Sequence, residues 1–149
     1  MSNLYVYLMR SRNKDNKGIP NFKQRDKTIL EYKENEDKII EEFKSFATKG
    51  VSGEQTRLYR SVNSRNEEKI REEFTIRLLR DKLSVTQLNR TLASVAQQVQ
   101  NRDESKWLFD FDVDDAILVK GFMEDINHFS NIPLNILRNI KLLMVMQLS

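Results

Sequence analysis

Two aspartates, Asp110 and Asp112, are the residues whose type and spacing most readily support chemistry. They end an apolar run, Trp107-Leu108-Phe109-Asp110-Phe111-Asp112. Alternate residues of a strand share one face, which places the two Cα atoms about 6 to 7 Å apart. Carboxylates at that spacing can bind one or two divalent cations, and Mg²⁺ or Mn²⁺ leaves coordination positions for water and phosphate. The sequence therefore predicts a metal site at Asp110 and Asp112.

A second interpretation of the same residues needs no metal. Asp112 is well placed to cap the helix expected after it, and Asp110 would then be a solvated surface carboxylate. Against this, Asp110 lies inside an apolar strand, where an unpaired carboxylate is costly unless a cation or a hydrogen-bond donor serves it. Both interpretations stay open at this point.

The segment 106–112, together with the upstream run Tyr59-Arg60-Ser61-Val62-Asn63, resembles a group of phage proteins that is in turn similar to the catalytic core of archaeo-eukaryotic primases. In those primases a strand-borne D-x-D binds the metals of nucleotidyl transfer. The resemblance implies metal roles for Asp110 and Asp112, a place in the host cytoplasm and, if the chain is active, metal-dependent nucleotidyl transfer. The family's later phosphate-gripping strand has no match here beyond His128. The resemblance thus implies a truncated and inactive relative.

The last ten residues differ in character from the chain before them, because residues 140–149 are abruptly apolar. One permitted codon choice for this stretch encodes Lys-Thr-Pro-Asn-Gly-Tyr-Ala-Ile in another reading frame, which is the hairpin expected next in the phage group. Our hypothesis is a frame shift after about residue 125. We accordingly expect one domain over residues 1–139 and an atypical apolar tail, 140–149, that adds little to the fold.

Basic and aromatic residues form a second set of candidates, for contact with nucleic acid. The net charge is only +3, but residues 10–33 are rich in Lys and Arg whereas residues 103–125 are rich in Asp and Glu. Arginines can bind phosphates and tyrosines can stack on bases. The alternative is that the arginines only solubilise the surface and the aromatic rings fill the core. The candidate nucleic-acid-binding residues are Arg10, Arg12, Arg57, Tyr59, Arg60 and Arg65.

Hydrophobic periodicity predicts the elements that must position these residues. Strands are expected at 4–9, 57–63 and 106–113, and amphipathic helices at 35–48, 64–78, 84–99 and 114–126. Ser64 with Glu67, and Ser84 with Gln87, have the spacing of capping boxes. The fold class expected is therefore α/β or α+β, a small sheet with amphipathic helices packed on it.

Composition excludes several classes of function. The chain has no cysteine, which removes disulfides, thiolate nucleophiles and cysteine-based zinc sites. It contains no phosphate-binding loop, dinucleotide fingerprint or hydrolase motif, and no apolar run long enough for a membrane. Two hypotheses remain. The first is a nucleic-acid-binding or nucleotide-binding domain of primase type, and the second is a non-enzymatic phage inhibitor, of the anti-CRISPR kind, that binds a host defence nuclease or its nucleic acid.

Overall fold

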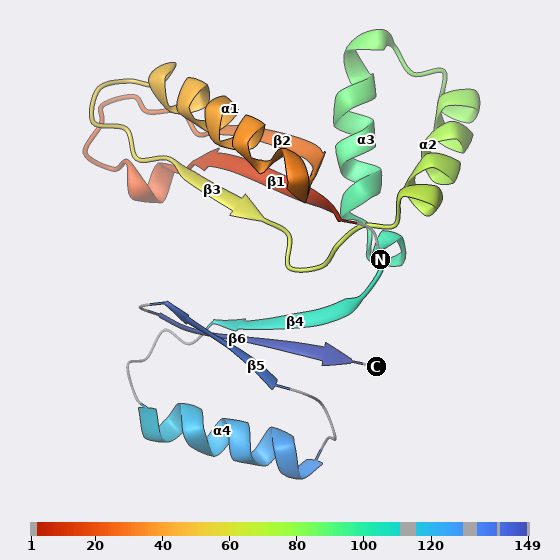
Figure 1. Ribbon diagram of the computed structural model, residues 1–149. Coiled ribbons are helices and arrows are strands. Elements are labelled where there is room, and N and C mark those ends of the chain that lie inside the picture. The colour runs from red at the N-terminus through yellow and green to blue at the C-terminus, as the bar shows by residue number, and fades with distance from the viewer. Residues whose placement is uncertain (1–2, 111–115, 130–133, 140, 149) are drawn as a thin grey trace. The chain divides into compact units, whose positions relative to one another are not determined.

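The chain divides into two compact units, Met1–Asp103 and Glu104–Ser149. The structure, a computed structural model, describes residues 3–110, 116–129, 134–139 and 141–148. Each unit contains one sheet of three antiparallel strands, and within the described ranges the first unit has three α-helices and the second has one (Figure 1). Antiparallel sheets with separate helices confirm the α+β alternative of the expected fold class.

The first unit is built on a sheet with the strand order β2-β1-β3. The strands are β1 (Leu4–Ser11), β2 (Arg25–Tyr32) and β3 (Arg57–Arg60). The central strand β1 has buried apolar side chains on both faces, because helices cover each face of the sheet. Both β1 and β3 were predicted, although β3 is shorter than the run 57–63 suggested. No strand was predicted at β2, because its charged residues disguise the alternation of apolar side chains.

Helices cover the two faces of this sheet. Helix α1 (Glu36–Thr48) packs Ile39 and Phe46 against Tyr7 and Met9 on one face. On the other face Leu4 and Val6 pack against Ile70 of α2 (Glu67–Asp81) and Val95 of α3 (Leu88–Gln97). Odd-numbered residues of β1 therefore face α1 and even-numbered residues face α2 and α3, as strand geometry requires. Short 3-10 turns are η1 (Asn13–Asp15), η2 (Lys33–Asn35), η3 (Val85–Gln87) and η4 (Val99–Asn101).

The two predicted capping boxes have different outcomes. Ser84 and Gln87 form a capping box, as predicted. The prediction for Ser64 was wrong, because α2 begins after Asn66, whose side-chain oxygen accepts from the Lys69 amide at 3.0 Å. Ser64 is instead buried, and its carbonyl accepts from the Asp103 amide.

The second unit has the strand order β4-β6-β5. Its elements are β4 (Ser105–Asp110), α4 (Ala116–Phe129), β5 (Leu134–Asn139) and β6 (Lys141–Leu148). From the sequence we expected one domain over residues 1–139 and a separate tail over 140–149. In the structure the division falls after Asp103, and most of the expected tail is β6, which pairs antiparallel with both β4 and β5. No helix in the described ranges is long and apolar enough to span a membrane.

Candidate nucleic-acid interface

The register of the first sheet brings several predicted residues to one face. Arg10 of β1 lies opposite Arg57 of β3 and, on its other side, opposite Asp26 of β2, while Tyr59 lies opposite Leu8. Residues that are opposite each other in an antiparallel pair share a face. These three residues, Arg10, Arg57 and Tyr59, therefore share one face of the sheet. At the other end of β1, Leu4 and Val6 on this same face pack against α2 and α3.

Two carboxylates hold the guanidinium groups of this face in place. Asp15 accepts from Arg12 Nε at 2.8 Å and from Arg57 Nε at 3.0 Å, with a second contact from each guanidinium. Asp26 likewise pairs with Arg10 at 2.8 and 3.2 Å. The hydrogen bond from Arg12 chiefly, and the charge of Arg57 with it, lower the pKa of Asp15, so this carboxylate stays ionised at neutral pH.

Tyr59 supplies an accessible aromatic ring beside these charges. Its residue surface is 38% exposed. The hydrogen bond with Asp15 chiefly, and the electrostatic influence of Tyr59 to a smaller extent, raise the pKa of Arg12 above its ordinary value. An exposed ring next to guanidinium groups can stack on a base while the cations contact the flanking phosphates. We call Arg10, Arg12, Arg57 and Tyr59 the arginine–tyrosine face.

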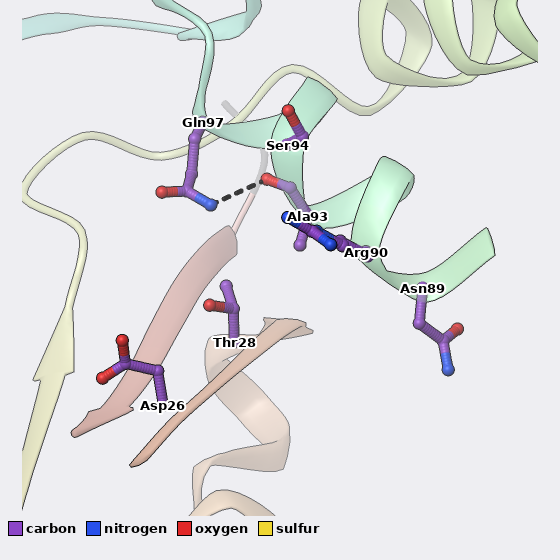
Figure 2. A pocket seen from close by; sticks show the side chains of 7 residues that line it. All are labelled: Asp26, Thr28, Asn89, Arg90, Ala93, Ser94 and Gln97. Carbon is purple, nitrogen blue, oxygen red and sulfur yellow. Dashed lines mark hydrogen bonds between the residues drawn. The ribbon is translucent and has the colours of Figure 1, made fainter. Parts of the chain in front are cut away.

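A polar cleft continues this face toward α3. It has a volume of about 540 Å³ and lies between β2 and α3, with Asp26 and Thr28 on the strand side (Figure 2). The side-chain amide of Gln97 donates to the Ala93 carbonyl at 3.0 Å, on the helix itself. Arg90 is exposed at the cleft and forms no ion pair with any residue in the described ranges. The lining residues are Asp26, Thr28, Asn89, Arg90, Ala93, Ser94 and Gln97.

Buried polar contacts fix the loop that leads into β3. Asn16 is 3% exposed and its amide nitrogen donates to the carbonyls of Arg12 and Gln55, while its oxygen accepts from the Gln55 amide at 2.6 Å. The Ser11 hydroxyl also donates to the Gln55 carbonyl at 3.0 Å. These bonds tie the end of β1 to the start of β3, so Arg12 and Arg57 are held by the same buried network.

An ion pair clamps the same loop to β2 and α1. Arg25 donates to Glu54 at 3.0 and 2.5 Å and to the Phe46 carbonyl at 3.2 Å, and its guanidinium lies 4.4 Å from the Phe46 ring centroid. Burial opposes ionisation of Glu54, but its interactions with the Ser11 hydroxyl, Arg25 and the Val51 amide outweigh burial and hold the pKa of Glu54 below its ordinary value. The clamp therefore depends on a charged carboxylate.

Two of the predicted nucleic-acid-binding residues lie elsewhere. Arg60 is opposite Tyr7 and so faces α1, where it pairs with Glu36 at 2.9 Å and lies 5.2 Å from the Tyr5 ring centroid. Arg65 follows β3 and is buried. The alternation of side chains along a strand could have separated Arg60 from Arg57 in advance. These two residues are three positions apart and cannot share a face of a regular strand.

The predicted metal site lies at the border of the described residues. Asp110 is the last residue of β4, and its side chain and the whole of Asp112 lie outside the described part of the chain. Within the described ranges no group of three or more His, Cys, Asp or Glu side chains is arranged to hold a metal ion.

Sequence reasoning missed the carboxylates and the cleft. Asp15 could have been paired with Arg12 from their spacing of three residues, but its contact with Arg57 depends on tertiary structure. Asp26 and Arg90 could be placed only once β2 and its packing on α3 were known.

No protein-family model matches the sequence, and comparisons with curated proteins and with solved structures found no match either.

Proposed function

We propose that the first unit binds single-stranded nucleic acid through the arginine–tyrosine face. The observation that carries the proposal is the register of β1 with β3, which puts the exposed Tyr59 on one face with Arg10 and Arg57, while Asp15 links Arg57 to Arg12. Single strands expose their bases for stacking on aromatic rings, and this form of recognition tolerates different sequences. A phage-type nucleic-acid-binding domain fits the same chemistry.

The carboxylates of the face set the strength expected of this binding. Asp15 and Asp26 neutralise part of the charge of Arg10, Arg12 and Arg57. Binding should therefore be weak and strongly dependent on salt. If all three arginines contact phosphates, the slope of log K against log salt is about −2, because each contact on a single strand contributes about −0.7.

The test is fluorescence anisotropy of a labelled single-stranded oligonucleotide of about 15 nucleotides, the upper range of such binding sites. Tyr59→Leu keeps an apolar side chain but removes the stacking ring, and it should weaken binding about fivefold or more, since stacking contributes about 1 to 3 kcal/mol per base. Arg57→Gln should reduce the magnitude of the salt slope by about 0.7.

The matched control is Arg60→Gln. Arg60 belongs to the same strand as Arg57, is similarly exposed and is also paired with a carboxylate, but it lies on the opposite face. The Arg60→Gln variant should therefore bind the oligonucleotide with unchanged affinity and an unchanged salt slope. Equal effects of the Arg57 and Arg60 variants would refute the assignment to this face, and an absence of binding at about 50 mM salt would favour a host protein as the target.

A further inference from the structure

Two arginines face each other across a short ladder outside the named strands. The Asn66 amide donates to the Asn101 carbonyl at 2.9 Å, and the Asp103 amide donates to the Ser64 carbonyl at 3.1 Å. These bonds flank Arg65 and Arg102, which form an antiparallel bridge. A pair flanked in this way is the non-hydrogen-bonded type, in which the Cα atoms are about 4.5 Å apart and the side chains approach most closely. The geometry thus sets two like charges side by side.

Three guanidinium nitrogens of this pair are buried without acceptors. Arg65 is 6% exposed, and its Nε and Nη1 atoms, like Nε of Arg102, are buried and have no hydrogen-bond partner. Burial first, and the charge of Arg102 second, lower the pKa of Arg65. An arginine nevertheless stays protonated in proteins, so the cost of the buried charge is not relieved by loss of a proton.

The carboxylate next to Arg102 in the chain is engaged with another side chain. Asp103 accepts from the side-chain amide of Asn66 at 2.8 Å. Within the described ranges, therefore, no carboxylate accepts a hydrogen bond from the buried Nε and Nη1 atoms of Arg65. A ligand that brings negative charge and several acceptor oxygens would satisfy both arginines together.

We propose that Arg65 and Arg102 bind a phosphate dianion, either inorganic phosphate or the terminal phosphate of a monoester. A phosphate monoester carries about −1.5 to −2 charges at pH 7, which matches two guanidinium groups, and its oxygens accept paired hydrogen bonds from arginine. A phosphodiester carries a single charge and fits less well. The preference is thus for a free phosphate or a terminal phosphate over the interior of a strand.

This phosphate site is distinct from the arginine–tyrosine face and does not depend on it. The Arg65 amide donates to the Leu4 carbonyl at the first residue of β1, whereas Arg10 lies six residues further along. At the rise of an extended strand that separation is about 20 Å. Either proposal can therefore fail while the other stands.

The test is thermal melting of the full chain in a buffer without oxyanions, with inorganic phosphate added and with chloride of equal ionic strength as the reference. Phosphate should raise the Tm by several degrees in proportion to the logarithm of its concentration. Arg102→Gln should abolish this increase. Without phosphate the same variant should melt at or above the temperature of the unmodified protein, because it removes a repelling charge.

Two further variants keep this test decisive. Arg65→Gln should also abolish the phosphate effect, and it replaces Arg102→Gln if that variant does not fold. Arg71→Gln is the control, since Arg71 is an exposed arginine on α2 that pairs with Glu67, and it should keep the full increase. No increase in the unmodified protein, or an equal increase in the Arg65 and Arg102 variants, would overturn the proposal.

The source of the phosphate is resolved by comparing three ligands in the same melting assay. If only inorganic phosphate raises the Tm, the ligand is a free anion. If a nucleoside 5′-monophosphate raises the Tm further than inorganic phosphate does, the ligand is a nucleotide. A 5′-phosphorylated oligonucleotide that exceeds its 5′-hydroxyl counterpart assigns a strand end. If the 5′-hydroxyl oligonucleotide alone is effective and Arg102→Gln does not reduce that effect, the ligand is not a phosphate dianion and the proposal fails.

Discussion

Glu54→Gln should destabilise the first unit, because it removes the charge from the clamp that leads into β3. The Glu54 side chain is 3% exposed and accepts from Arg25 and from the Val51 amide at 2.9 Å. Glutamine keeps the shape and one neutral acceptor. A hydrogen bond to a charged group contributes about 1.5 to 3 kcal/mol, so we expect a loss of about 2 kcal/mol in the free energy of unfolding. For a unit of this size the Tm should fall by about 10 °C.

The pH dependence gives the sign of the effect. The folded protein holds the pKa of Glu54 below its ordinary value. The stability from this group is therefore fully present above the pKa of the unfolded chain and is lost as the pH falls through the lower, folded value. The difference between the unmodified protein and Glu54→Gln should be complete at neutral pH and should shrink in acid.

Urea unfolding followed by circular dichroism at several pH values measures this difference. Glu42→Gln is the matched control, because Glu42 pairs with Lys27 on the surface with both side chains about half exposed. Surface ion pairs contribute little, so this control should change stability by no more than about 0.5 kcal/mol. A Glu54→Gln variant as stable as the control at neutral pH, or a difference that grows as the pH falls, would refute the reasoning.

Three other outcomes are expected. Met9→Ala should lower the free energy of unfolding in urea by about 2 to 5 kcal/mol, because the Met9 side chain of β1 is fully buried against α1. A smaller loss would show that the core relaxes around the cavity. Gly50→Ala should lower the Tm, since its Cβ would lie 2.7 Å from Cδ of Glu54, and an unchanged Tm would show that the clamp can move. If Asp110 and Asp112 bind metal, Mg²⁺ should raise the Tm and the double Asn variant should lose that increase; equal responses of both proteins would remove the metal site.

The fold was predictable where one pattern dominates the sequence. β1 was found because Leu4 to Met9 is a continuous apolar run rich in aromatic residues, and α1 because its apolar residues recur at helical spacing. β2 was missed because Arg25, Asp26, Lys27 and Glu31 interrupt its pattern, and these charges are tolerated since the strand is at the edge of its sheet. The start of α2 was misplaced because Ser64 hydrogen-bonds across a ladder that local sequence does not reveal.

The candidate site was predictable in residue type but not in geometry. Arginines and an exposed tyrosine could be named from the sequence, and the strand period could have separated Arg60 from Arg57. The carboxylate that joins Arg12 to Arg57 could not be found, because Asp15 reaches β3 only through the folded loop. Arg65 was expected to contact nucleic acid, and its burial opposite Arg102 depends on a pairing of residues far apart in the chain.

The arginine–tyrosine face is tested most directly by nuclear magnetic resonance of the ¹⁵N-labelled full chain during titration with a single-stranded oligonucleotide. The account predicts that the largest amide shifts occur at residues 8–12 and 57–59, that the Tyr59→Leu variant loses them, and that they diminish as salt is added. Shifts confined to other residues, or none at low salt, would contradict binding at this face.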